Sequence, residues 1–230
     1  MRPRPSLTLN RTVNSKHMKT VLAISSVMLG TAILSACSGS GAGKAPADNG
    51  VISAIMTRRS IRKYQDKAVP RELLEKVAEC GIWAPNAMNA QRWAVRIVDS
   101  PDYIDGVTKI FVEGNPEMAA RNTYFKNVFR NAPAIICVAV EPARFTDIDA
   151  GLMGENMMLA AHSLGLGTCC LGGPVDFLMN NPDARPFYDA LQFPEGYQLR
   201  YILAIGWPDE TPDPRPRDAS KIQFVDFKAQ

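Results

Sequence analysis

Histidine is scarce in this chain of 230 residues, which holds only two. His17 precedes an apolar segment near the N-terminus, so His162 is the one histidine of the remaining sequence. A single histidine cannot build a zinc site of several histidines, nor a relay of them. Because His162 stands in a segment with few polar residues, we expect it to be a hydrogen-bonded residue of the core. No metal site is predicted.

Several binding motifs are missing as well. No G-x-G-x-x-G follows a predicted strand, and neither G-K-[ST] nor G-x-S-x-G occurs. These absences exclude a Rossmann fingerprint, a P-loop and the nucleophile elbow of α/β-hydrolases. The formal net charge is only +3, and basic residues are interleaved with acidic ones. The charge pattern therefore gives no reason to expect nucleic-acid binding.

Cysteine occurs five times, in a spacing that fits neither a metal site nor a redox motif. Cys169 and Cys170 are adjacent, unlike the C-x-x-C pattern of redox and metal-binding proteins. Cys80 and Cys137 lie in apolar segments, where a thiol acts as a small hydrophobic side chain. An exported protein can form disulfides, but the spacing selects no pair.

Near its N-terminus the chain has a short apolar run, residues 21–33, after a charged segment. This run is too short to span a bilayer comfortably and is typical of a signal peptide. It is followed by Leu34-Ser35-Ala36-Cys37, which resembles the lipobox of bacterial lipoproteins. The resemblance implies acylation of Cys37 and a membrane-anchored lipoprotein that faces the periplasm or the cell exterior. A cysteine that follows an ordinary signal peptide by chance is the alternative.

Composition divides the chain into three parts. Residues 1–37 are predicted to be upstream residues and a lipoprotein signal peptide. Residues 38–50 are rich in Ser, Gly, Ala and Pro, which predicts a flexible tether. Residues 51–230 form the folded part, and a chain with 46% hydrophobic residues can build one sizeable core. The sequence shows no internal repeat and no second domain.

Long apolar runs predict the centre of the fold. Residues 134–140 show no polar alternation, which is typical of a strand covered on both faces, and residues 199–207 share this pattern. Residues 149–164 predict a central helix that is apolar nearly all round and ends at Gly165. Further elements are predicted at residues 51–56 (helix), 70–82 (helix), 93–98 (strand) and 111–128 (partly helical, broken near Gly114 and Pro116).

The C-terminal part is rich in proline. Pro208, Pro212, Pro214 and Pro216 are expected to hold the chain extended. Residues 222–227 then have strand propensity. Such a strand has no obvious partner in its own domain, so it could pair with a sheet edge of another protomer.

Three polar or glycine-rich segments are not explained by core building, and Arg-Pro-Arg at residues 215–217 is a fourth. Residues 58–62, Arg-Arg-Ser-Ile-Arg, offer forked cations and a hydroxyl that suit a phosphate, although a solvated basic turn is the simpler explanation of the charge alone. Residues 85–93 carry side-chain amides, which suit a heteroaromatic ring. Residues 165–173 end in two glycines whose backbone N–H groups can approach a ligand, with a strand-to-helix turn as the alternative.

The order and spacing of these segments resemble the nitroreductase family of FMN-dependent oxidoreductases, over residues 51–230. The matching stretches are residues 58–62, residues 84–93, and Gly-Leu-Gly at 165–167 leading to Leu-Gly-Gly at 171–173. The resemblance implies an α+β fold with a central, mostly antiparallel sheet flanked by helices. It also implies a homodimer that exchanges its C-terminal arms.

The resemblance further implies which residues bind FMN. The phosphate would be held by a basic set: Arg58, Arg59, Ser60, Arg215 and Arg217. The cation at the pyrimidine end of the flavin would be Arg62. The backbone that faces the central ring would come from Cys170, Leu171, Gly172 and Gly173, with the Gly172 N–H directed at N5. A loop from the second protomer would add Pro85, Asn86, Ala87 and Asn89.

Three positions depart from the family pattern. Arg92 stands where relatives often have Pro, and Asn86 stands where Ser is common. Gly172 stands where some members have Glu, but the implied contact uses the backbone. The effect of Arg92 on access to the flavin does not follow from the sequence.

The function implied by the resemblance is hydride transfer from NAD(P)H through flavin N5 to a nitro, quinone or related small-molecule acceptor. No protein acid or base is obligatory for this chemistry, so no catalytic side chain is predicted. The alternative is a membrane-anchored flavin-binding protein that exchanges electrons with a membrane partner, because reduced nicotinamides are expected to be scarce outside the cytoplasm. A purely structural role of the family fold is a third interpretation.

Overall fold

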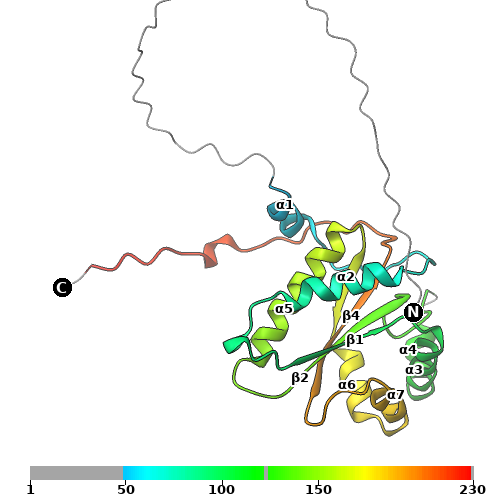
Figure 1. Ribbon diagram of the computed structural model, residues 1–230. Coiled ribbons are helices and arrows are strands. Elements are labelled where there is room, and N and C mark those ends of the chain that lie inside the picture. Colours follow the sequence, from blue (N-terminus) through cyan, green and yellow to red (C-terminus); the bar gives the residue numbers. More distant parts are fainter. Residues whose placement is uncertain (1–48, 122–123, 229–230) are drawn as a thin grey trace, which may run out of the picture. The chain divides into compact units, whose positions relative to one another are not determined.

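The computed structural model describes residues 49–121 and 124–228 of the chain. The predictions made for residues 1–48, including the lipobox cysteine Cys37, lie outside this part. At the centre is a four-stranded sheet in the order β1-β2-β4-β3, with all neighbouring strands antiparallel (Figure 1). The strands are β1 (Trp93–Val98), β2 (Ala134–Val140), β3 (Gly167–Leu171) and β4 (Gln198–Gly206). The predicted α+β fold with an antiparallel sheet is confirmed.

The two inner strands, β2 and β4, form the most apolar part of the fold. Every residue of β2 is buried, as its unbroken apolar run predicts. Cys137 of β2 lies opposite Ile202 of β4, and the register shifts between Val138 and Ala139. Burial raises the pKa of the Cys137 thiol to about 12. The thiol therefore stays protonated at neutral pH and serves as a core residue, as expected.

Helices α2 (Arg71–Ile82) and α5 (Thr146–Ser163) cover one face of the sheet (Figure 1). Leu74 and Val77 of α2 are fully buried. The helices approach closely at Gly81, where a Cβ would lie 2.6 Å from Cγ of Met157 in α5. Only glycine permits this contact without a shift of the Met157 side chain or of the helices that carry the two residues. Among the described residues, no helix combines the length and the apolar character needed to cross a bilayer.

The opposite face is covered by α3 (Pro101–Gly114), α6 (Gly173–Asn180) and α7 (Arg185–Ala190). A short helix, α4 (Pro116–Ala120), follows α3. Three 3₁₀ turns complete the order: η1 (Ala87–Asn89), η2 (Pro182–Ala184) and η3 (Ala219–Lys221). The apolar cluster on this face combines residues of the helices, the sheet and the loop before β2, among them Ile104, Val107, Phe129, Val175, Leu178 and Ile202.

The chain enters the fold through α1 (Gly50–Thr57) and then follows the outer edge of β3. The Asn49 side chain caps α1 by accepting a hydrogen bond from Val51 N at 2.9 Å. Beyond the helix, Ser60 forms a parallel bridge with Thr168, and Ile61 N donates to Thr168 O at 2.9 Å. This pairing fixes the basic segment 58–62 against the sheet edge.

Two helix starts differ from the sequence prediction. Helix α5 begins at Thr146, before the predicted start at residue 149. Helix α3 begins at Pro101, well before residue 111, and the Ser100 side chain caps it. A serine followed by proline at the first helical position is a start signal that the prediction did not use. The predicted break near Gly114 and Pro116 is confirmed, because α3 ends and α4 begins there.

The glycine-rich segment 165–173 contains an unpredicted strand, β3. Contrary to the expectation that core building does not explain this segment, Cys169 and Leu171 are buried in the core. Gly165 has φ +78° and ends α5, as expected, so the strand can turn back onto β4. Helices α6 and α7 were not predicted either.

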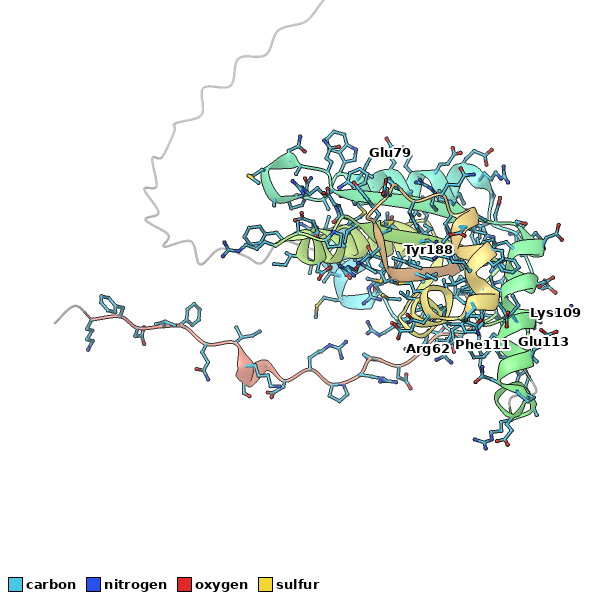
Figure 2. All side chains as sticks on the ribbon, turned by 90° about the horizontal axis from the view of Figure 1, so that it is seen from below. Arg62, Glu79, Lys109, Phe111, Glu113 and Tyr188 are labelled. Carbon is cyan, nitrogen blue, oxygen red and sulfur yellow. The ribbon has the colours of Figure 1, made fainter. Side chains whose placement is uncertain are left out.

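The strand predicted at residues 222–227 does not form within this chain. The segment lies beyond η3 and its apolar side chains are exposed, from 83% at Ile222 to 100% at Phe224. Figure 2 shows these side chains standing away from the rest of the folded part. Pairing with a second chain therefore stays a prediction.

Candidate functional site

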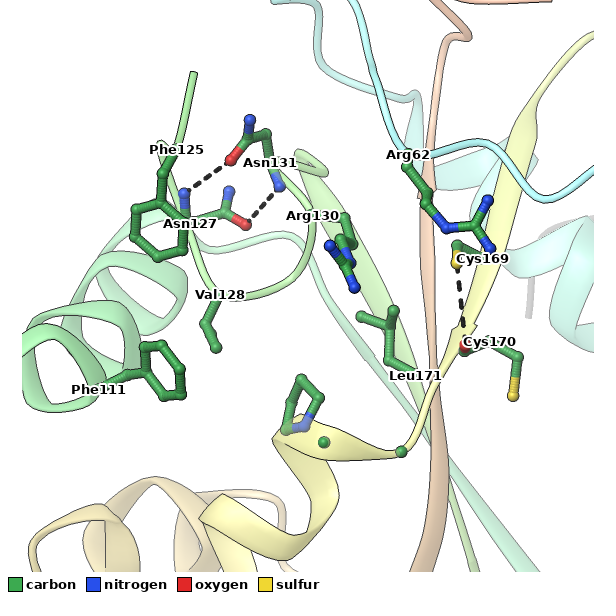
Figure 3. Close-up of a pocket in the computed structure, with 13 residues that line it drawn as sticks. Arg62, Phe111, Phe125, Asn127, Val128, Arg130, Asn131, Cys169, Cys170 and Leu171 are labelled. Carbon is green, nitrogen blue, oxygen red and sulfur yellow. Dashed lines mark hydrogen bonds between the residues drawn. The ribbon is translucent and has the colours of Figure 1, made fainter. Parts of the chain in front are cut away.

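Two cavities follow one another along β3, beside the segment that leaves α1. The larger cavity has about 530 Å³, within the usual range for small-molecule sites, and the smaller has about 240 Å³. The larger cavity is lined by Arg62, Phe111, Phe125, Asn127, Val128, Arg130, Asn131 and residues 169–174 (Figure 3). The smaller cavity is lined by Thr57, Arg58, Arg59, Ile61, His162, residues 165–168, Pro208 and residues 210–212.

The end of β3 gives the larger cavity an exposed backbone. Strand β3 ends at Leu171, and α6 begins at Gly173 with Gly172 as its N-cap. A Cβ built on either glycine would meet no atom within 4 Å. A flat ligand can therefore come close to the main chain here, which fits the predicted role of these two glycines.

Arg62 supplies a positive charge to the larger cavity (Figure 3). Its Nη1 donates to the carbonyl oxygen of Ser60 at 3.3 Å. Its backbone N–H and that of Lys63 both donate to Oε1 of Glu210. Glu210 therefore holds the main chain at this point and leaves most donors of the Arg62 guanidinium available to a ligand.

The adjacent thiols of Cys169 and Cys170 are free and point to different sides of β3 (Figure 3). Burial raises the pKa of Cys169, although the nearby guanidiniums of Arg62 and Arg130 act in the opposite direction. Burial and the neighbouring Cys169 raise the pKa of Cys170. Both thiols are therefore protonated at neutral pH, and neither is an activated nucleophile.

Arg58 carries the most unusual polar atoms of the smaller cavity. Its Nε and Nη1 are buried and have no hydrogen-bond partner among the described residues. The nearest carboxylate oxygen, Oε1 of Glu155, lies 3.5 Å from Nε and forms only a loose ion pair. Native proteins rarely leave buried donors unpaired, and a buried cation requires an anion. This arrangement indicates an anion site at Arg58.

Arg59 lines the smaller cavity together with Arg58, whereas Ser60 lines neither cavity. Both residues also make contacts within the chain. Nη1 of Arg59 donates to the carbonyl oxygens of Met56 and Arg58, each at 2.8 Å. Arg59 therefore stabilises the C-terminal end of α1 by hydrogen-bonding to its free carbonyl groups. Ser60 is held by its bridge to Thr168 at the entrance of β3.

The expectation for His162 is confirmed in part: its side chain is hydrogen-bonded, but it is not a core residue. It lies in the last turn of α5, only partly buried, and lines the smaller cavity. Its Nε2 is 2.9 Å from Oγ1 of Thr57. Burial lowers the pKa of His162, and the charges of Arg58 and Arg59 lower it further. The helix turns this side chain toward the basic segment because residue 162 lies on the face that packs against α1.

The loop predicted to reach a second protomer lies away from both cavities of its own chain. The expected residues are Pro85, Asn86, Ala87 and Asn89. The loop is fixed by Ala87 N, which donates to Oδ1 of Asp149 at 3.1 Å, and by Gln91 N, which donates to Oδ1 of Asn86 at 2.9 Å. Met88 and Asn89 adopt positive φ values of 56° and 51°. These hydrogen bonds hold the loop in place within its own chain.

Arg215 and Arg217 are also separate from the cavities of this chain. Both are exposed, and among the described residues Nη1 of Arg217 donates only to the carbonyl oxygens of Arg215 and Pro216. Arg92, which departs from the family pattern, pairs with Glu141 at 3.3 Å and lines neither cavity. The predicted cofactor residues therefore fall into two groups, of which one chain assembles only the first.

One wall of the larger cavity is formed by Phe111, Phe125, Asn127, Arg130 and Asn131. The family resemblance implies that residues 103–129 lie over the flavin and govern substrate choice, but it singles out none of them, and Arg130 and Asn131 lie outside this range. The only signal that the sequence offers for Arg130 and Asn131 is their polar character, two residues before the buried strand β2. A polar loop before a strand is common, and nothing in its spacing relates it to β3.

Comparison with known proteins agrees with this geometry. The family model described as "Nitroreductase family" matches residues 55–207. A candidate NADH dehydrogenase/NAD(P)H nitroreductase of Methanothermobacter thermautotrophicus is 28% identical over 72% of this chain and 81% of its own length. An NADPH-flavin oxidoreductase of Vibrio harveyi is 26% identical over 74% of this chain and 70% of its own length. A nitroreductase with bound FMN from Desulfitobacterium hafniense superposes with a TM-score of 0.66 at 27% identity, covering 78% of this chain and 100% of that structure.

Proposed function

Because the chain belongs to the nitroreductase family, we propose that it is an FMN-dependent oxidoreductase that transfers hydride from NAD(P)H to a nitro, quinone or related small-molecule acceptor. One observation carries this proposal. The larger cavity is lined both by the open backbone of Gly172 and Gly173 and by the side chain of Arg62. That combination suits a flat, electron-accepting ring.

The residues present fit FMN. A phosphate dianion needs cationic donors, and the unpaired Nε and Nη1 of Arg58 offer them beside Ser60. The ring system needs a backbone without side chains and a cation, which Gly172, Gly173 and Arg62 provide. Bound FMN would supply the chemistry of accepting a hydride and passing two electrons to the acceptor.

The protein side chains have supporting roles in this proposal. A fixed positive charge at Arg62 stabilises negative charge that develops on a reduced ring, because it is oriented before the reaction begins. The thiols of Cys169 and Cys170 are protonated and give no competing nucleophile. The backbone of residues 171–173 orients the ring. No side chain of the cavity is needed as an acid or base.

We also propose that two chains complete the site as a homodimer. Large apolar side chains are exposed on α1, on the loop around η1 and on the C-terminal arm, as exemplified by Met56, Trp83, Met88 and Phe224. Exposed apolar surface of this extent is typical of interaction sites. A second chain would bring the loop at residues 85–89 and the arginines of the arm to the first group of cofactor residues.

A steady-state assay tests the enzymatic proposal. The protein is incubated with FMN, NADH or NADPH, and a quinone, and oxidation of the nicotinamide is followed with and without the quinone. We expect FMN-dependent oxidation that the acceptor accelerates. The rival, a flavin-binding protein that exchanges electrons with a membrane partner, is supported only by the predicted location and gives no nicotinamide oxidation.

We propose that Cys37 carries a lipid that anchors the domain outside the cytoplasm. The support is the lipobox-like sequence at residues 34–37 after a short apolar run. Cell fractionation of a Cys37→Ala variant tests it. The variant should leave the membrane fraction, whereas the unchanged chain should stay there. Equal membrane association of both proteins contradicts the anchor.

A further inference from the structure

Arg130 is a positively charged residue that lines the larger cavity. It is not among the residues proposed to bind FMN. Its side chain lies between the loop before β2 and the Leu171 side chain (Figure 3). No hydrogen bond or ion pair joins it to any other described residue. Together with Arg62 it gives the cavity two guanidiniums, while the lining residues include neither Asp nor Glu. An unpaired guanidinium in a cavity without acidic residues is suited to an anionic ligand group.

The loop that carries Arg130 is held in one conformation by two asparagines. Oδ1 of Asn127 accepts from the backbone N–H groups of Phe129 and Asn131, at 2.9 and 3.0 Å. Oδ1 of Asn131 accepts from those of Lys126 and Asn127, at 2.7 and 3.0 Å. Phe129 is fully buried and anchors the loop in the core. Arg130 is therefore presented from a preorganised position, as binding residues require.

The backbone at Arg130 is also unusual. Arg130 and Asn131 have φ values of 59° and 64°, in the left-handed region that asparagine tolerates better than arginine. The unfavourable backbone conformation of Arg130 occurs where its side chain lines the cavity.

The wall beside Arg130 is aromatic. The rings of Phe111 and Phe125 are stacked, with centroids 6.5 Å apart and an interplanar angle of 24°. Phe177 supports Phe111 through an edge contact at 5.3 Å. An aromatic wall next to a guanidinium can take a flat ring that carries a carboxylate.

We propose that Arg130 selects acceptors, by binding the anionic substituent of an aromatic acceptor such as a nitrobenzoate. This inference deepens the proposed function by naming the substrate class of the same cavity. Each two-electron step stays balanced: the nitro group takes the hydride of NAD(P)H and one proton from solvent, loses one oxygen as water, and becomes a nitroso group. Arg130 takes no part in the transfer and acts through binding alone.

Equilibrium binding is the first test. Benzoate is titrated calorimetrically into the FMN-saturated protein and into three variants. Arg130→Asn removes the charge and suits the left-handed backbone, Arg130→Lys keeps the charge, and Arg144→Ala removes an exposed arginine that lines neither cavity. We expect the Kd of benzoate to rise about ten-fold or more in Arg130→Asn, less in Arg130→Lys, and not in Arg144→Ala. Equal benzoate affinity of the unchanged protein and Arg130→Asn overturns the proposal, as does the absence of benzoate binding.

Kinetics then separate the acceptor from the nicotinamide donor, whose phosphates share the same chemistry. In Arg130→Asn, kcat/KM should fall about ten-fold more for 4-nitrobenzoate than for nitrobenzene, and the difference should shrink at high salt. A rise of KM for NADPH with an unchanged ratio between the two acceptors assigns Arg130 to the donor and overturns the proposal. If the proposed enzymatic function is wrong, the unchanged protein oxidises no nicotinamide with either acceptor. The benzoate titration still tests the role of Arg130 in that case, because it needs no turnover.

Discussion

At the scale of single residues, Arg58 shows how a binding side chain can be identified before its ligand is present. Two of its nitrogen atoms are buried without a hydrogen-bond partner, a costly arrangement unless a ligand supplies the missing acceptor. Its position in the basic segment could be predicted from the sequence. The lack of hydrogen-bond partners for its nitrogen atoms could not be predicted, because the burial of a charge depends on how α1, α5 and β3 pack together.

Replacing Arg58 should separate stability from binding. Arg58→Met removes a buried, poorly paired cation, so we expect the free energy of unfolding of the FMN-free protein to rise by about 1 kcal/mol. The same variant should bind FMN about ten-fold or more weakly, because a charged hydrogen bond is worth roughly 1.5–3 kcal/mol.

Denaturant unfolding and an FMN fluorescence titration measure the two effects. Riboflavin, which lacks the phosphate, serves as the control ligand and should bind both proteins equally. Arg71→Ala, which breaks an exposed ion pair with Asp99, should change neither ligand's affinity. Unchanged FMN affinity in Arg58→Met contradicts the assignment of the anion site.

His162 should make stability depend on pH. Its pKa in the folded protein is lowered, so the unfolded chain binds a proton more readily than the folded one. The contribution of neutral His162 is therefore present above its ordinary pKa of about 6.5 and is lost as the pH falls below that value.

Urea unfolding at pH 7.5 and at pH 5.5 checks this dependence against His162→Gln, which cannot titrate. On going from pH 7.5 to pH 5.5, the unchanged protein should lose more free energy of unfolding than His162→Gln. A constant difference between the two pH values contradicts the lowered pKa.

The scarcity of polar residues around His162 predicts a core position for it, which the structure does not show. Helix α5 is apolar nearly all round, so periodicity could not reveal which face its last turn presents to α1. Arg130 was missed for a related reason. Its importance arises from the approach of the loop before β2 to the end of β3, and these segments are distant in sequence.

At the scale of elements, helices α2 and α5 depend on a close approach at Gly81. A Cβ there would lie 2.6 Å from Cγ of Met157. Gly81→Ala should therefore lower the free energy of unfolding by about 1–3 kcal/mol through overpacking, despite the better helix propensity of alanine. Gly114→Ala, at a helix end with open space around it, is the matched control and should change stability little. Thermal unfolding compares them, and equal stability of the two variants contradicts the close approach.

Strands β1, β2 and β4 could be predicted because each is an apolar run of strand length with turn residues beside it. Strand β3 could not, because glycine and two cysteines give it neither a clear alternation nor strong strand propensity. Its strand conformation comes from pairing with β4 on one side and with Ser60 on the other. The missed strand is also the element on which both cavities depend.

At the scale of the whole molecule, one chain assembles only part of the predicted cofactor site. We expect the exposed apolar residues of the C-terminal arm to bind a second chain, which would complete the site. Replacing both Phe224 and Phe227 by alanine should shift the protein from dimer toward monomer and weaken FMN binding. Sedimentation velocity and an FMN titration measure both effects.

Arg217→Ala is the control for this experiment. It removes a predicted phosphate contact and leaves the apolar arm intact, so it should weaken FMN binding about ten-fold without changing the sedimentation coefficient. A monomeric starting protein, or a dimer unaffected by loss of both phenylalanines, contradicts the proposed exchange of arms.

The most direct test of the central claim is an absorbance spectrum of the purified protein after incubation with FMN, recorded without oxygen before and after addition of NADH or NADPH. An FMN-dependent oxidoreductase retains a yellow flavin through gel filtration, and its visible absorbance bleaches with at least one of the two nicotinamides. A yellow protein that bleaches with dithionite but with neither nicotinamide contradicts NAD(P)H as the donor and favours a membrane electron partner. A colourless protein contradicts the FMN site itself.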